Sequence, residues 1–224
     1  MPSPEASAIL LSLKVSAVAT VLALPLAFLA AAALTFGRFR GRVLLDVLVN
    51  LPLTLPPVVI GYGLVVLLGR QGWIGRWLEP LGITLIFTWK AAVLATLVVG
   101  FPLMVRSIRT AMEGIDPQLI EAARSLGAKP LDALLSVILP LSRRGLLAGA
   151  VLLFARGLGE FGATVIVAGN IPGRTQTIPL AIYDYANSPG GDRMALLLCG
   201  VSVALSLAVL LLHERLVRGP SKGA

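Results

Sequence analysis

Residues 194–212 read MALLLCGVSVALSLAVLLL, nineteen consecutive amino acids without a charged side chain. A helix of about 20 apolar residues crosses the hydrocarbon core of a bilayer, so this stretch predicts a transmembrane helix. The composition of the whole chain agrees, because 57% of its 224 residues are hydrophobic and 13% are charged. Soluble domains carry about 25% charged residues. The composition therefore excludes a soluble enzyme and a disordered chain, and it predicts a polytopic membrane protein.

Four further segments are apolar and long enough to cross a bilayer once, and none is long enough to cross it twice. We therefore expect an all-α fold of about five transmembrane helices in a single domain over residues 1–224. The expected spans lie at about residues 10–35, 45–69, 84–106, 142–169 and 193–214.

The loops between these spans differ in their content of basic residues. Cytoplasmic loops of membrane proteins carry an excess of Lys and Arg, so the richer side is expected to be the cytoplasm. This places the N-terminus outside and the C-terminus inside, and it explains the net charge of +8 without a nucleic-acid partner. One side has twelve basic residues and the other has four: Arg38, Arg40, Arg42, Arg106, Arg109, Arg124, Lys129, Arg143, Arg144, Arg215, Arg218 and Lys222 against Arg70, Arg76, Arg174 and Arg193.

Three tryptophans, Trp73, Trp77 and Trp89, flank the loop between the second and third spans. In the expected orientation this loop lies at the outer face. Indole rings prefer the membrane–water interface, so we interpret these residues as anchors that contact membrane lipid.

The loop between the third and fourth spans contains the signals of a short helix. Asp116 and Pro117 form a helix start, since Asp caps the first free N–H groups and Pro suits the first helical position. Gly127 is the matching stop. The expected helix at about residues 117–127 is amphipathic, with Leu119 and Leu126 on its apolar face. A helix this short needs a docking surface, and the residues alone leave open whether this is the bilayer, the bundle or a partner.

The same loop resembles the E-A-A-x3-G-x9-I-x-L-P loop of the permeases of bacterial ABC importers, with Val137 in place of the isoleucine. The resemblance implies the permease core of a type I importer in the inner membrane of a bacterium. It also implies that the loop carries a coupling helix that docks on a separate ABC ATPase. The chain would pair with a second copy of itself and receive substrate from an extracytoplasmic binding protein. The matching positions are Glu121, Ala122, Ala123, Gly127, Leu139 and Pro140.

Other segments resemble the permeases of molybdate importers in particular. They are residues 51–61 (LPLTLPPVVIG), 101–106 (FPLMVR), 155–164 (ARGLGEFGAT), 170–173 (NIPG) and 177–179 (TIP). The resemblance implies that molybdate or tungstate is the substrate and that the binding protein holds an oxyanion. Sulfate permeases are similar at residues 159–163, so sulfate or another oxyanion is the alternative.

Arg156 and Glu160 are the charged residues of the apolar run 145–168 in the fourth span, and they lie one helical turn apart, so that their side chains can meet. Charges inside a membrane usually face a bundle interior or a water path. The pair either serves as part of an oxyanion pathway or gate, or neutralises itself and fixes helix packing. We favour the second interpretation, because an arginine already bound to a carboxylate is a poor anion ligand. Pro56 and Pro57 kink the second span, and the carbonyl groups freed there either line the pathway or only accompany a bent helix.

The sequence contains no nucleotide-binding glycine loop, no metal-binding cluster and no recognisable catalytic constellation, so we expect neither an enzyme nor a cofactor. A membrane enzyme acting on lipid would need clustered polar residues at one bilayer face. A carrier coupled to ions would need acidic residues deep in its spans. The apolar runs 15–34, 47–68 and 194–212 contain no acidic residue. The energy for transport is therefore expected to come from a separate subunit.

Overall fold

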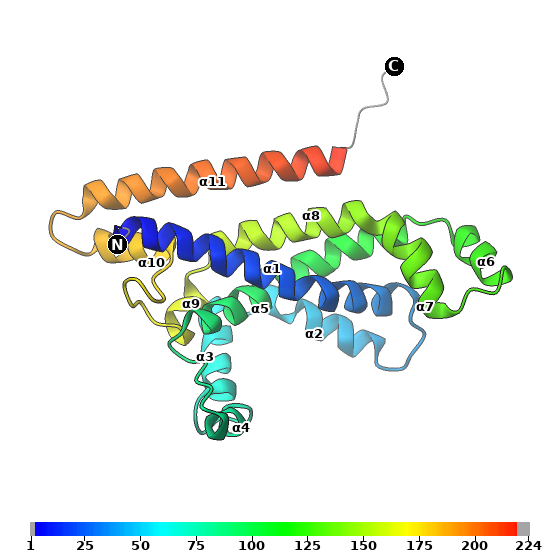
Figure 1. The fold of residues 1–224 in the computed structure, drawn as a ribbon, viewed down its shortest axis with the longest axis horizontal. Helices are drawn as coiled ribbons and strands as arrows, with labels where there is room; N and C mark the ends of the chain where they lie inside the picture. Colours follow the sequence, from blue (N-terminus) through cyan, green and yellow to red (C-terminus); the bar gives the residue numbers. More distant parts are fainter. Residues whose placement is uncertain (1–2, 219–224) are drawn as a thin grey trace, which may run out of the picture.

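The computed structural model describes residues 3–218, with side chains up to residue 215. Lys222 and the side chain of Arg218, which contribute to the charge bias, lie outside this part. The described residues form helices joined by loops, without a β-strand (Figure 1). In chain order the elements are α1 (Pro4–Phe36), α2 (Arg42–Thr54), α3 (Pro57–Leu68), α4 (Gly75–Leu78), η1 (Glu79–Leu81), α5 (Trp89–Glu113), α6 (Pro117–Ser125), α7 (Pro130–Ala133), the π-helical turn η2 (Leu134–Ile138), α8 (Leu139–Leu158), α9 (Gly162–Val167), α10 (Ile178–Ala186) and α11 (Asp192–Arg218).

Four helical segments are long and apolar enough to cross a membrane: α1, α5, α11 and the continuous stretch Pro130–Leu158 that joins α7, η2 and α8. The helices α2 and α3 form a fifth candidate only as a pair, since they meet at an angle of 116°. The described residues therefore contain four candidate spans, or the expected five if α2 and α3 together form one span.

The helices differ from the expected spans, and three of the differences bear on the site. The second segment is divided at residues 55–56, because Pro57 in the first turn of α3 has no N–H to continue the ladder of α2. The third begins at Trp89, after a turn in which Phe87 has a φ of 59° and donates its N–H to the carbonyl of Val167. The fourth is interrupted after Leu158 and resumes as the short α9.

The core lies where α1, α5 and α8 pack together, and small residues make this packing possible. Ala19, Ala23, Ala27 and Ala31 follow one another at intervals of four along α1, and all are fully buried. A Cβ atom on Gly149 of α8 would lie 3.0 Å from the carbonyl oxygen of Met104 in α5. Small side chains let membrane helices approach closely, and the close approach provides the van der Waals contact that holds them together.

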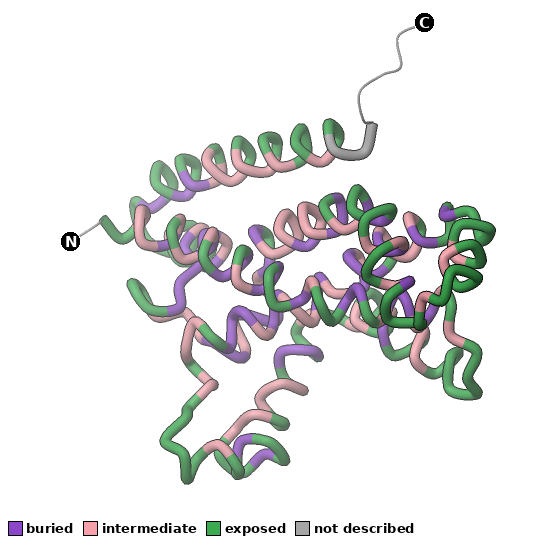
Figure 2. The backbone as a smooth tube through the Cα atoms, turned by 45° about the vertical axis from the view of Figure 1, so that its right-hand side comes forward, coloured by how far each residue is buried: buried purple, intermediate pink, exposed green. Residues whose placement is uncertain are grey.

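The burial pattern separates this core from the periphery (Figure 2). The exposed α11 contacts α8 and α10. The expected anchors Trp73 and Trp77 are 77% and 70% exposed, on or beside the arm formed by α3 and α4 (Figure 1). Trp89 differs from them, because its ring lies 3.9 Å below the ammonium group of Lys14.

The segment 171–193, between the fourth and fifth spans, contains α10. This helix packs against α1 and α11 and buries Ile178, Leu180 and Ala181. The hydroxyl of Ser12 accepts the N–H of Ile178 at 2.8 Å. The Tyr185 hydroxyl donates to the carboxylate of Glu5 at 2.7 Å, and this bond raises the pKa of Tyr185. These contacts attach the loop to the N-terminal part of α1.

Candidate functional site

The first candidate site is the break between α8 and α9, where Glu160 is buried with only 2% of its surface exposed. One carboxylate oxygen, Oε1, accepts the N–H of Ala163 at 2.8 Å. This N–H belongs to the first turn of α9, which has no partner for it inside the helix. Glu160 therefore acts as a cap for α9, and its negative charge lies at the positive end of the helix.

Arg156 completes the charge arrangement at this break. Its Nη1 atom lies 2.8 Å from Oε2 of Glu160, so the two side chains meet as their spacing predicts. The arginine side chain is 34% exposed, whereas the carboxylate it binds is buried. Removing one partner of a buried pair leaves a charge uncompensated, which is more costly than removing both. The geometry fits the interpretation of a pair that neutralises itself.

The second candidate, the proline break between α2 and α3, packs directly on the first. A Cβ atom on Gly162 would lie 3.0 Å from the Cβ of Pro57, and one on Gly61 would lie 2.7 Å from the carbonyl oxygen of Ala163. Glycines at both positions therefore allow α3 and α9 to touch through their backbones. We call this contact, with Pro56, Pro57, Arg156 and Glu160 around it, the double break. The sequence did not predict that the two breaks meet, although Gly61 and Gly162 are the signal of such a close approach.

The third candidate is α6, which the structure places at the opposite end of the molecule from the N-terminus (Figure 1). The Asp116 side chain accepts the N–H of Gln118 at 2.9 Å, and Gly127 has a φ of 92°. Both ends of the helix thus have the caps that the sequence predicts. No residue of α6 is buried, and Leu126 just beyond it is 90% exposed. Ile120 packs partly against the core, whereas Leu119 and Leu126 of the expected apolar face stay exposed.

Leu139 and Pro140, the last two matching positions of the loop, form the start of α8. They follow the π-helical turn η2, which sequence reasoning missed. Pro140 has no N–H, so it donates no helical hydrogen bond to the main-chain carbonyl of Ser136. The hydroxyl of Ser136 donates separately to the carbonyl of Asp132 at 2.5 Å. Short π-helical turns inside α-helices are frequent at functional sites.

Over residues 3–215 the structure contains no group of three or more His, Cys, Asp or Glu side chains that could hold a metal ion. The polar side chains of the double break form one ion pair and one helix cap. This arrangement can hold or release a helix end, but it offers no nucleophile next to a base.

Comparison with known proteins shows that the chain is similar to membrane subunits of transport systems. Residues 23–221 match the family described as "Binding-protein-dependent transport system inner membrane component". The molybdenum transport system permease protein ModB of Escherichia coli (strain K12) is 49% identical over 219 residues, covering 97% of this chain and 96% of that protein. The probable sulfate transport system permease protein cysT of Nephroselmis olivacea is 39% identical, over 77% of this chain and 62% of that one.

Among solved structures, an inward-facing form of the MetNI methionine ABC transporter is similar in fold. The TM-score is 0.68 at 18% sequence identity, and the match covers 97% of this chain and 98% of that chain. The described helices thus have the arrangement of a type I ABC importer permease.

The Arg156–Glu160 pair generates a prediction about folding. Replacing Glu160 with Gln keeps an oxygen for the N–H of Ala163 but leaves Arg156 without its carboxylate, so the variant should unfold at a lower temperature in detergent. Glu160→Ala also removes the cap and should cost about 1 kcal/mol more. The double variant Arg156→Met/Glu160→Gln should recover most of the loss of Glu160→Gln. If the double variant is no more stable than Glu160→Gln alone, the pair does not neutralise itself, and our interpretation is wrong.

Proposed function

The chain belongs to the family of inner membrane components of binding-protein-dependent transport systems, and from this we propose that it is the membrane-spanning subunit of an ATP-driven importer of molybdate and tungstate. As a member of this family it is a multi-pass membrane protein and a transport subunit, not an enzyme. The observation that carries the substrate is the 49% identity to a molybdenum permease over almost the full length of both chains. Sulfate is the second candidate, because a sulfate permease is 39% identical over a shorter stretch.

Transport by this chain requires partners that supply energy and substrate. The family implies an ATPase and a substrate-binding protein, and we propose that the latter holds an oxyanion. We also propose a homodimer whose pathway lies between the two copies, since the core of a single chain is filled by α1, α5 and α8. Exposed apolar side chains of α2 and α3, such as Leu44, Val58 and Tyr62, offer a surface for the second copy. Those of α11, such as Leu196 and Leu211, would contact lipid.

The coupling residues support a mechanical route from the ATPase to the pathway. We propose that α6, with Glu121, Ala122, Ala123 and Gly127, docks on the ATPase. Residues 130–158 form one helical stretch that runs from beside α6, through Leu139 and Pro140, to the double break. Movement of the docked helix would therefore reach Arg156 and Glu160 through a single lever. A switch between two discrete arrangements of the double break would open or close the pathway.

The substrate proposal is tested by reconstituting the permease with its ATPase and binding protein in vesicles. Uptake of molybdate and tungstate should require ATP and should far exceed uptake of sulfate. The two metal oxyanions share charge, shape and size, whereas sulfate is smaller, so one site separates sulfate from them more easily than it separates them from each other. Faster uptake of sulfate than of molybdate would establish the second candidate in place of the first.

The orientation is tested by single cysteines in a Cys199→Ser background. Pro189→Cys lies at an exposed position of the loop after α10 and should react with an impermeant thiol reagent added to intact cells. Gly41→Cys and Ala128→Cys should react only after the membrane is permeabilised, since the basic side of the chain faces the cytoplasm. The reverse pattern would place α6 outside the cell and would exclude its docking on an ATPase.

The coupling role is tested at Gly127, whose φ of 92° disfavours side chains although no atom lies within 4 Å of an added Cβ. Gly127→Val adds about 1–3 kcal/mol of backbone strain and should shift the end of α6. We expect normal membrane insertion but loss of the ATP hydrolysis that the loaded binding protein stimulates. Gly127→Asn is the matched control, because Asn adopts positive φ more readily, and it should retain most of the stimulation. Full stimulation in Gly127→Val would show that this loop does not transmit the movement.

A further inference from the structure

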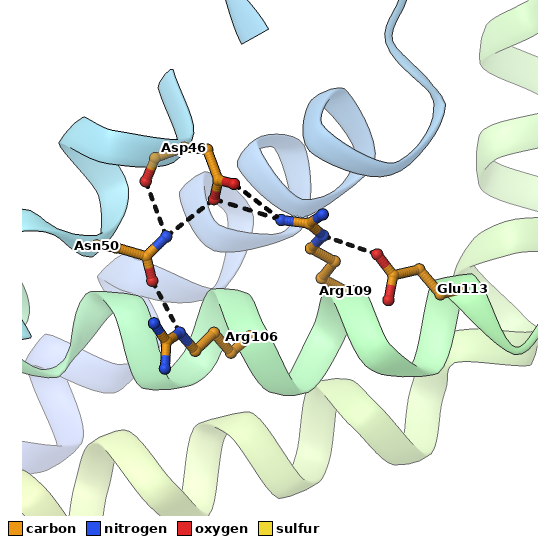
Figure 3. A network of polar contacts seen from close by, with 5 residues as sticks. All are labelled: Asp46, Asn50, Arg106, Arg109 and Glu113. Carbon is orange, nitrogen blue, oxygen red and sulfur yellow. Dashed lines mark hydrogen bonds and ion pairs between the residues drawn. The ribbon is translucent and has the colours of Figure 1, made fainter. Parts of the chain in front are cut away.

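A pocket of about 510 Å³ lies between α2 and the end of α5 that leads to α6. In the sequence the arginines of this pocket count only as loop charges, whereas in the structure Arg42 begins α2 and Arg106 and Arg109 lie on α5. Figure 3 shows the polar network that Arg106 and Arg109 form with α2. Its polar lining consists of Arg42, Asp46, Asn50, Arg106 and Arg109.

Asn50 determines how Arg106 is presented in this pocket. The Asn50 amide nitrogen donates to the main-chain carbonyl of Asp46 at 2.8 Å and to its carboxylate at 2.9 Å. The amide oxygen of Asn50 is then free to accept the Nε–H of Arg106, also at 2.8 Å. Within the described chain, the two terminal nitrogens of Arg106 have no hydrogen-bond partner. A neutral amide thus fixes the guanidinium by its Nε edge without neutralising its charge.

The arginines of the pocket differ in whether a carboxylate neutralises them. Arg109 binds the carboxylate of Asp46 at 3.3 Å and that of Glu113 at 2.8 Å, so both nearby acids are engaged by one arginine. Arg42 and Arg106 form no ion pair with any residue between 3 and 215. Three arginines against two carboxylates leave the network with an excess of one positive charge. Arg42 is also the first residue of α2, whose free N–H groups add positive partial charge at the same place.

We propose that this pocket binds a tetrahedral oxyanion dianion at the inner end of the pathway, just before its release. A guanidinium held by its Nε edge presents its terminal N–H groups in the planar arrangement that binds two oxygens of an oxyanion. Asp46 lies in the same wall and repels an anion, which keeps the binding weak and suits release. The pocket lies on α2, the helix that leads to the double break. The inference rests on the proposed function and orientation.

The test measures anion binding without transport. Val43 lines the pocket and is 75% exposed, so Val43→Cys in a Cys199→Ser background reports on the site. The full complex is placed in nanodiscs of phosphatidylcholine. An anionic thiosulfonate should label the introduced thiol faster than a cationic one, and Arg106→Gln should lower the ratio of the two rates about fivefold. Arg144→Gln, which removes an exposed arginine of α8 outside the pocket, is the matched control and should change the ratio by less than about twofold.

Molybdate is then added during labelling with the neutral reagent N-ethylmaleimide. It should slow labelling more than potassium chloride of equal ionic strength does, and Arg106→Gln should abolish this protection while Arg144→Gln retains it. Equal slowing by chloride, or protection that survives Arg106→Gln, would overturn the proposal.

A lipid phosphate carries the same chemistry as the free anion, so the experiment is repeated in nanodiscs of phosphatidylglycerol. Molybdate should still protect there; slow labelling that molybdate does not change would assign the site to lipid and overturn the proposal. Uptake of molybdate by wild-type vesicles distinguishes a failure of the anion-site proposal from a failure of the proposed import function. Uptake without protection refutes this inference alone, whereas protection without uptake refutes the proposed function and leaves only an anion site.

Discussion

The constraint on which this structure depends is that a backbone in lipid has no water to satisfy its N–H and C=O groups. Helices satisfy these groups internally, so a break is tolerated only where protein provides partners. The chain breaks two of its apolar segments and packs the breaks against each other. Glu160 takes an N–H of α9, and Val167 takes that of Phe87. The double break is therefore irregular backbone that is partly covered by protein, with Glu160 buried and Pro56 and Gly159 exposed.

The features that the sequence predicted are those set by local chemistry. Composition indicated the membrane, and Asp116 and Gly127 indicated both ends of α6, because caps depend on neighbours in the chain. The pairing of Arg156 with Glu160 followed from helical spacing alone. The contact of Gly61 with Ala163 could not be predicted in this way, since it joins residues about a hundred positions apart. The turn η2 and the interruption after Leu158 were missed because an apolar run looks the same whether its helix is continuous or broken.

The two arginine sites differ in a way that bears on mechanism. At the double break Arg156 is bound by a buried carboxylate, whereas in the pocket between α2 and α5 an amide holds Arg106 and leaves its charge available. An unpaired cation midway along a pathway would hold a dianion strongly and slow its passage, because Coulomb energies grow as water is excluded. A cation at an exposed end is screened and binds weakly. On the proposed pathway, a neutralised pair inside and a free charge at the exit would allow an anion to pass.

If the proposed pathway binds the anion weakly, one protein can select the substrate while another moves it. A permease that bound its substrate tightly in one arrangement would need an equal free energy to release it from that arrangement, since a ligand favours the state it binds better. A separate binding protein can select the oxyanion without this cost to the moving helices. The permease then needs only a lever, a pair of breaks with two arrangements and a charge that does not trap the anion. In the proposed mechanism, the segment 130–158, the double break and the pocket at Arg106 would meet these three requirements.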